Sequence, residues 1–275
     1  MTLPTIAGVS RLDRQFARLR ADGRTGLVTY VTAGDPSLDQ TAAVLQALDR
    51  AGADVIEVGV PFTDPLADGP VIQRAAERGL AAGATLAKIL RLLEGVRGGI
   101  DAPLVLFTYA NPVFRMGLDV FRARAASAGV DGVLVIDLPI EEAAEFQRRL
   151  DEVEIATIFL LSPTTTEARL KTAAARGRGF LYGISRLGVT GMRNEIAPGA
   201  RELAERIRRV TSLPIAVGFG LSRPEHVSEV GRWADAAVVG SALVNVIAEA
   251  GDSSELVDRV AAYVRWLKGS GPEPS

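Results

Sequence analysis

Short runs of apolar, largely β-branched residues alternate with longer segments of helical period along the whole chain. Several of the short runs are almost continuously apolar, which is typical of parallel strands covered on both faces. They predict strands at Gly26–Thr32, Asp54–Val60, Pro103–Tyr109, Asp131–Asp137, Glu154–Leu160, Gly179–Ile184, Pro214–Val217 and Ala234–Val239. The segments between them predict helices, among them Leu38–Arg50, Leu118–Ala128, Glu141–Leu150, Glu167–Ala175, Ala200–Arg209 and Glu225–Arg232.

The number and spacing of these elements favour a closed barrel. Eight strand–helix units in 275 residues leave roughly 34 residues per unit, the size of a βαβ repeat. In a weak repeat, Arg50–Val58 resembles Ser127–Val135, and Gly52 and Gly129 are predicted to end the preceding helices. No Gly-x-Gly-x-x-Gly sequence follows a strand, which disfavours an open dinucleotide-binding sheet. We therefore expect an α/β fold, a single-domain (β/α)8 TIM barrel with extra helices over residues 1–268, and a disordered tail at 269–275.

Composition excludes several classes of protein. The chain is 48% hydrophobic and contains no cysteine, so disulfide scaffolds, thiolate metal sites and cysteine nucleophiles are excluded, and a reducing, cytoplasmic location is expected. The 31 basic residues nearly balance the 33 acidic ones, which gives no reason to expect binding to nucleic acid. No uncharged apolar stretch approaches the ~18 residues of a membrane span, and the N-terminal segment lacks the pattern of a secretory signal.

Scarce lysine and histidine narrow the possible chemistry further. The only histidine, His226, lies just inside a predicted short helix and is expected to be exposed and inert. Lys88 and Lys171 lie in helical patterns and Lys268 lies near the C-terminus, so a Schiff-base lysine at a strand end is not expected. A histidine-rich metal site and an imidazole electrophile are equally disfavoured, and no metal site is predicted. Acid–base chemistry by carboxylates remains, on a substrate that can hold electrons itself.

Two carboxylates stand where a barrel enzyme places its chemistry, at the C-terminal ends of the strands. Strand alternation puts Val55, Glu57 and Gly59 on one face, and a carboxylate inside such an apolar run is expected to have a raised pKa unless an arginine pairs with it. Asp68 follows in a proline-rich loop long enough to return over the barrel mouth. Two such carboxylates can divide acid and base roles, whereas Asp64 in the same loop is most simply a turn residue.

Glycines in three late loops indicate a phosphate site. Gly188–Gly191, Gly218–Gly220 and Gly240–Ser241 follow the last three predicted strands, where barrels commonly bind phosphate with backbone N–H groups and a helix N-terminus. Ser162–Thr166 is interpreted instead as a helix cap. Tyr182 shares a strand face with Ile184 and is either a site residue or a packed ring.

Longer motifs resemble those of a known family, the α subunit of tryptophan synthase, from about Phe16 to Trp266. The motifs are Thr32–Pro36, Glu57–Gln73, Tyr109–Pro112, Pro163–Thr166, Ser185–Gly191, Gly218–Gly220 and Val239–Ala242. The Glu57–Gln73 stretch together with the Ser185–Gly191 loop is the specific part. Departures are mild: Thr63 often appears as serine in the family, and Gly183 replaces a larger residue beside Tyr182.

The resemblance implies a lyase that cleaves indole-3-glycerol phosphate to indole and glyceraldehyde 3-phosphate, by a retro-aldol reaction, in L-tryptophan biosynthesis. It implies Glu57 as the general acid toward the indole ring and Asp68 as the carboxylate that holds the indole N–H. Tyr182 is implied as a support near Glu57, and Thr190 as a loop residue that closes onto Asp68. The remaining implied residues are Gly191, Phe219, Gly220, Gly240 and Ser241 for phosphate and Tyr30, Phe107 and Tyr109 for the indole pocket.

The resemblance also implies a partner, the β subunit, in an α2β2 heterotetramer. Asp64, Asn111 and Pro139 match positions that face that subunit, so Asp64 is an interface candidate as well as a turn residue. No cofactor is implied for this chain, and pyridoxal phosphate is expected in the β subunit. Two alternatives remain: a stand-alone lyase that acts without a β subunit, and a non-catalytic barrel that binds a phosphorylated ligand and regulates its partner.

Overall fold

The eight predicted strands appear as nine in the computed structural model, which describes residues 10–184, 199–218 and 220–274. Each predicted run overlaps its strand, with ends that differ by a few residues at most, and the fifth run forms two short strands separated by Ile158. The strands are β1 (Gly26–Thr32), β2 (Val55–Gly59), β3 (Leu104–Thr108), β4 (Gly132–Val135), β5 (Ala156–Thr157), β6 (Phe159–Leu161), β7 (Leu181–Ile184), β8 (Ile215–Gly218) and β9 (Ala236–Val239).

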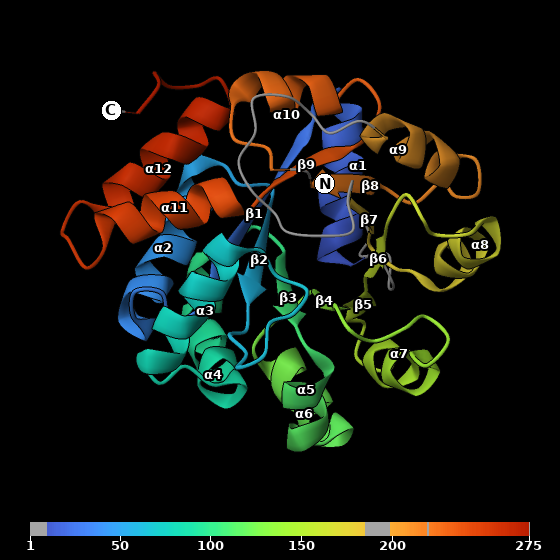
Figure 1. The fold of residues 1–275 in the computed structure, drawn as a ribbon, viewed down its shortest axis with the longest axis horizontal. Helices are drawn as coiled ribbons and strands as arrows, with labels where there is room; N and C mark the ends of the chain where they lie inside the picture. The colour runs from blue at the N-terminus through green and yellow to red at the C-terminus, as the bar shows by residue number, and fades with distance from the viewer. Residues whose placement is uncertain (1–9, 185–198, 219, 275) are drawn as a thin grey trace, which may run out of the picture.

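All paired strands are parallel, in the order β5-β4-β3-β2-β1-β9-β8-β7-β6. The two end strands of this order, β5 and β6, are consecutive in the chain, so the fifth run closes the ring by pairing with β4 through its first half and with β7 through its second half. Backbone hydrogen bonds continue through the junction, from Ile158 N–H to the Val133 carbonyl (2.9 Å). This arrangement confirms the predicted (β/α)8 barrel, with its helices around the strands (Figure 1).

The predicted helical segments are confirmed, and the structure contains further helices for which the sequence pattern had given no bounds. They are α1 (Arg11–Ala21), α2 (Leu38–Ala51), α3 (Pro70–Ala81), α4 (Leu86–Val96), the 3-10 helix η1 (Arg97–Gly99), α5 (Ala110–Met116), α6 (Leu118–Ser127), α7 (Ala144–Asp151), α8 (Glu167–Arg176), α9 (Ala200–Arg208), α10 (Pro224–Val230), α11 (Ser241–Ala250) and α12 (Leu256–Leu267). Residues 268–274 form turns and irregular backbone. Within the described residues, no helix is long and apolar enough to cross a membrane.

Alternating strand residues build two separate apolar layers. Side chains such as Ile56, Val58 and Leu106 pack outward against the helices. Those on the other face, such as Val55 and Val105, pack inside the ring. Leu12, Phe16 and Leu19 of α1 pack against them, so α1 closes one end of the barrel. Because these inner residues lie in the first half of their strands, α1 closes the N-terminal end and the chemistry is left to the C-terminal end.

Local signals of the sequence explain several helix ends. Gly52 and Gly129 adopt φ values of 98° and 65° after α2 and α6, which confirms them as helix-ending glycines. Thr166 caps α8 by accepting a hydrogen bond from the Arg169 N–H, which confirms the predicted cap. The prediction for His226 is wrong: its side chain is 7% exposed, because α10 turns this residue inward to meet the loop that follows β8.

Candidate active site

Glu57 lies inside the barrel on β2, beside Tyr30 of β1 and Val105 of β3 in the strand register. The residue is 0% exposed, and neither carboxylate oxygen has a hydrogen-bond partner among the described residues. The arginine partner that the sequence left open is therefore wrong for this part of the chain. Burial without a counter-charge raises the pKa of Glu57 from 4.5 to about 8. A carboxyl group with that pKa is protonated near neutral pH and can donate a proton.

Asp68 lies in the loop between β2 and α3, at the end of the barrel opposite α1, and is half-buried. The Tyr109 hydroxyl donates to its carboxylate (3.0 Å), and the side-chain amide of Gln73 donates to its backbone carbonyl (2.8 Å). Burial raises the pKa of Asp68 to about 6, while the hydrogen bond from Tyr109 opposes this shift. At neutral pH this group is therefore ionised while Glu57 is still protonated.

Two tyrosine rings lie beside these carboxylates because a neighbouring strand carries a glycine. The Tyr30 hydroxyl lies above Gly59, and the Tyr182 hydroxyl lies above Gly218, where an added Cβ would stand only 2.6 Å from that oxygen. Burial raises the pKa of Tyr30, and the charges of Asp68 and Glu57 raise it further. Burial and the charge of Glu57 raise the pKa of Tyr182 in the same way. Both phenols therefore stay neutral donors next to the carboxylates.

Aromatic rings form the walls between the two carboxylates. The rings of Tyr30 and Phe107 meet edge to face with centroids 5.4 Å apart, and Phe62 stacks on Tyr109 at 4.8 Å. Tyr109 also accepts a hydrogen bond from the Ala67 N–H (3.2 Å), which ties the Asp68 loop to the end of β3. The surroundings suit a flat aromatic ligand with one polar N–H group.

One anchor of this loop was missed by the sequence reasoning. Asp35, in the turn after β1, is buried and accepts two hydrogen bonds of 2.7 Å from the Arg78 guanidinium of α3. Since α3 directly follows the Asp68 loop, the pair fixes that loop relative to β1. The sequence offered only an Asp-Pro turn after a strand and an arginine in a later helix. Because the spacing between two such residues is not fixed, the pair could not be predicted.

The late glycine loops also meet at the C-terminal end of the strands. Gly220, after β8, has φ of 73°, and Gly240 is the residue before α11, so the buried Ser241 opens that helix. This places a helix N-terminus and a left-handed glycine in adjacent loops, because β8 and β9 are paired. Three predicted residues, Thr190, Gly191 and Phe219, lie outside the described residues.

The predicted interface residues Asp64, Asn111 and Pro139 are all exposed. They lie in three loops or helix starts that follow the neighbouring strands β2, β3 and β4. Two large apolar side chains on the same segments are also exposed, Leu66 at 84% and Phe114 at 50%.

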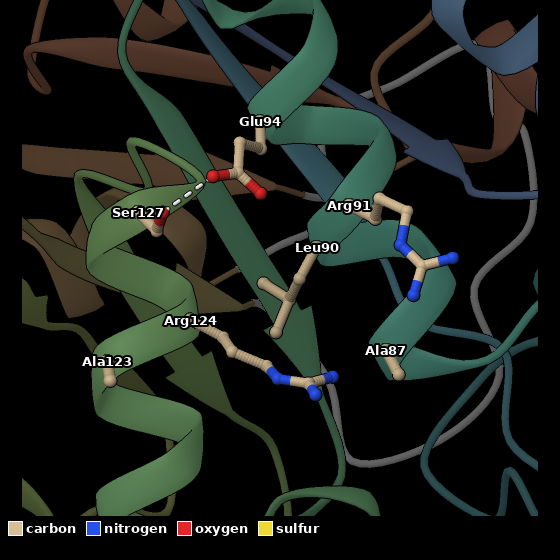
Figure 2. A pocket seen from close by; sticks show the side chains of 7 residues that line it. All are labelled: Ala87, Leu90, Arg91, Glu94, Ala123, Arg124 and Ser127. Atoms are coloured by element: carbon tan, nitrogen blue, oxygen red, sulfur yellow. Dashed lines mark hydrogen bonds between the residues drawn. The ribbon is translucent and has the colours of Figure 1, made fainter.

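A groove on the outer surface lacks this constellation. This groove has a volume of about 370 Å³ and lies between α4 and α6. There Ser127 donates to Glu94 (2.6 Å), and the Arg124 side chain extends from α6 toward α4 (Figure 2). The groove lies on the outside of the barrel, away from the strand ends. Among the described residues, no group of three or more His, Cys, Asp or Glu side chains is arranged to hold a metal ion.

A (β/α)8 barrel with a buried acid, an ionised carboxylate and an aromatic pocket at its strand ends defines a class, the barrel enzymes that use carboxylate acid–base chemistry. Comparison with known proteins specifies the family. Residues 16–270 match the family model described as tryptophan synthase alpha chain. The tryptophan synthase alpha chain of Solibacter usitatus is 46% identical over 260 residues, covering 94% of this chain and 97% of the relative. That of Caulobacter vibrioides is 48% identical over 248 residues, or 90% of each chain.

Solved structures agree with the sequence relatives. A chain of Mycobacterium tuberculosis tryptophan synthase superposes with a TM-score of 0.88 at 35% identity, covering 95% of this chain and 98% of that chain. A mutant tryptophan synthase alpha-subunit from Pyrococcus furiosus superposes with a TM-score of 0.82 at 40% identity, covering 89% and 98%. The chain belongs to the tryptophan synthase alpha chain family. It is a lyase of tryptophan biosynthesis, and the reaction of its family is the cleavage of indole-3-glycerol phosphate.

Proposed function

We propose that Glu57 and Asp68 carry out this cleavage together. Protonated Glu57 donates its proton to the indole ring carbon that bears the glycerol side chain, and ionised Asp68 stabilises the positive charge at the ring nitrogen. The Glu57 carboxylate then accepts the proton of the adjacent hydroxyl group. The carbon–carbon bond breaks, its electron pair returns to the ring, and indole and glyceraldehyde 3-phosphate result. Glu57 ends protonated, as it began.

The observation that carries this proposal is the contrast between Glu57, which is buried with no hydrogen-bond partner among the described residues, and Asp68, which is half-buried and hydrogen-bonded by Tyr109. This contrast separates their pKa values, about 8 for Glu57 and about 6 for Asp68. Two carboxyl groups whose environments hold them in opposite protonation states near pH 7 are suited to one acid and one charge-stabilising role. The substrate ring receives the electrons itself, so the steps assigned to this chain use no cofactor.

The other site residues are assigned to the indole ring, to the support of Glu57 and to the phosphate. Tyr30, Phe107 and Tyr109 line the indole pocket, and the neutral Tyr182 hydroxyl supports Glu57. Gly220, Gly240 and Ser241 hold the phosphate through backbone N–H groups, the Ser241 hydroxyl and the N-terminus of α11, together with Gly191 and Phe219. We assign Thr190 to the closure of the site over Asp68.

We further propose an α2β2 assembly in which the β subunit, carrying pyridoxal phosphate, binds over the loops after β2, β3 and β4. Asp64, Asn111 and Pro139 are exposed there, and Leu66 and Phe114 expose large apolar surface beside them. Exposed apolar side chains surrounded by polar ones are typical of partner surfaces. Indole made inside the barrel would leave toward this face. We assign the protein to the cytoplasm, because a chain without cysteine fits a reducing compartment.

The decisive experiment measures indole release from indole-3-glycerol phosphate by the wild type, Glu57→Gln, Asp68→Asn and the exposed control Glu202→Gln. Glu57→Gln should nearly abolish turnover and retain substrate binding, because glutamine keeps the shape and loses the proton. Asp68→Asn should lower kcat strongly, and a change in KM alone would reduce Asp68 to a positioning group. Turnover like that of the wild type in Glu57→Gln would refute the mechanism.

Adding a β subunit to the same assay separates the alternatives. Stimulation by the β subunit supports the assembly, whereas full activity without it favours a stand-alone lyase. Ligand binding with no indole release under either condition would favour the non-catalytic barrel.

A further inference from the structure

The peptide groups of Ser222 are held from both sides by buried side chains that the mechanism does not use. The Ser222 N–H donates to Nδ1 of His226 (3.2 Å), and the Tyr263 hydroxyl donates to the Ser222 carbonyl (2.8 Å). His226 is 7% exposed and Tyr263 is 6% exposed. The two side chains come from α10 and α12, so elements far apart in the sequence meet at one residue of a loop.

Ser222 lies two residues after Gly220, in the short connection between β8 and α10. This connection contains the positive-φ glycine of the proposed phosphate loop. Leu221 between them is 2% exposed and packs into the core between barrel and helices. The segment from Gly220 to Ser222 is therefore fixed by one buried apolar side chain and by two part-buried hydrogen bonds to its backbone.

We propose that His226 and Tyr263 are positioning residues for phosphate binding: they hold the Gly220–Ser222 backbone so that its loop presents N–H groups to the substrate phosphate. The proposal rests on the phosphate site of the proposed function. It assigns a role to the only histidine of the chain, which the sequence predicted to be exposed and inert.

The chemistry of the two side chains fits this role. An imidazole that accepts through Nδ1 must be unprotonated at that nitrogen, so His226 offers a fixed acceptor to the backbone N–H of Ser222. The Tyr263 ring packs against Trp266 with centroids 5.7 Å apart, which fixes the direction of its hydroxyl. Binding an anion by backbone groups depends on their orientation before the ligand arrives, because ordering a loose loop on binding lowers affinity.

The test compares two ligands that differ only in phosphate, indole-3-propanol phosphate and indole-3-propanol, by titration calorimetry. Tyr263→Phe and His226→Leu each remove one hydrogen bond to the loop. We expect each to weaken binding of the phosphorylated ligand about 5- to 10-fold, the effect of roughly one lost hydrogen bond, and to change binding of the alcohol less than twofold. His226→Asn keeps an acceptor near the position of Nδ1 and should restore most of the affinity.

Controls separate this proposal from the one on which it rests. Ser127→Ala, which removes a hydrogen bond in the groove between α4 and α6, should leave both affinities unchanged. Ser241→Ala reports on the phosphate site directly. If the wild type does not prefer the phosphorylated ligand, the phosphate site itself is wrong.

If the wild type prefers it and Ser241→Ala weakens it, but Tyr263→Phe and His226→Leu leave it unchanged, the positioning role alone is refuted. Equal weakening of both ligands would also refute it, because a merely structural defect does not distinguish them. Tyr263→Phe deletes a single oxygen atom and decides the matter if His226→Leu does not fold.

Discussion

Burial of Glu57 should make the whole protein less stable as the pH rises, and replacing it with glutamine should remove that effect. The unfolded chain releases this proton near the ordinary pKa of 4.5, whereas the folded protein retains it up to about 8. Between these values the unfolded state binds fewer protons than the folded state, so the free energy of unfolding falls with rising pH. The stability associated with the raised pKa is fully present below 4.5 and is lost as the pH passes through about 8.

The size of the effect follows from the two pKa values. One pKa unit corresponds to about 1.4 kcal/mol, so the complete loss above pH 8 is about 5 kcal/mol. About 2 kcal/mol of it has already been lost at pH 6, which leaves about 3 kcal/mol between pH 6 and pH 9. Other titrating groups, Asp68 among them, contribute equally to the wild type and to Glu57→Gln and cancel in the difference.

Urea unfolding of both proteins at pH 6, 7, 8 and 9 measures this difference directly. Relative to Glu57→Gln, the wild type should lose about 3 kcal/mol over the series, while the exposed control Glu202→Gln should follow the wild type. Parallel curves for wild type and Glu57→Gln, within about 1 kcal/mol, would show that the carboxyl group is not desolvated. The argument for Glu57 as an acid at neutral pH would then fail with it.

Three further predictions concern the same loops. The pH profile of kcat/KM should be bell-shaped, rising as Asp68 ionises near pH 6 and falling as Glu57 loses its proton near pH 8, and a flat profile from pH 5 to 9 would contradict both roles. Tyr109→Phe removes the hydrogen bond that lowers the pKa of Asp68, so the acidic limb should move to higher pH; an unmoved limb would separate it from Asp68. Arg78→Met leaves the buried Asp35 unpaired and should lower the free energy of unfolding by about 3 kcal/mol in urea titrations, whereas a loss below about 0.5 kcal/mol would show that Asp35 is hydrated.

The barrel could be predicted from the sequence because its strands obey a strong local rule. A parallel strand covered on both faces is apolar along its length, so each of the eight runs coincided with its strand to within a few residues. The division of the fifth run at Ile158 could not be seen, because it depends on how the ring closes between β4 and β7. Strand alternation likewise predicted that Glu57 shares a face with Val55 and Gly59, whereas the identity of this face as the barrel interior and the lack of a hydrogen-bond partner among the described residues are properties of three-dimensional packing.

His226 shows where local reasoning fails. A histidine at the start of a short helix after a proline is usually exposed, and the helical pattern alone gives no reason to bury it. His226 is buried against the loop four residues earlier, where it accepts a hydrogen bond from the Ser222 N–H, and Tyr263 of a helix that begins thirty residues after His226 donates to the same Ser222. The Asp35–Arg78 pair escaped for the same reason, since its 43-residue separation carries no periodic signal.

The depth of each carboxylate within the barrel decides which of them can act as an acid. Glu57 lies on the strand itself, one inward position above Val55 and the apolar layer closed by α1, where burial disfavours its ionised form and no residue in the described part of the chain hydrogen-bonds to its carboxylate. Asp68 lies on a loop at the rim, half-buried and hydrogen-bonded by Tyr109, and its pKa rises less. Two chemically similar groups thus differ in protonation because the fold places them at different distances from solvent. Exchanging the carboxylates for each other would leave this gradient in place, so the role belongs to the position in the barrel more than to the residue type.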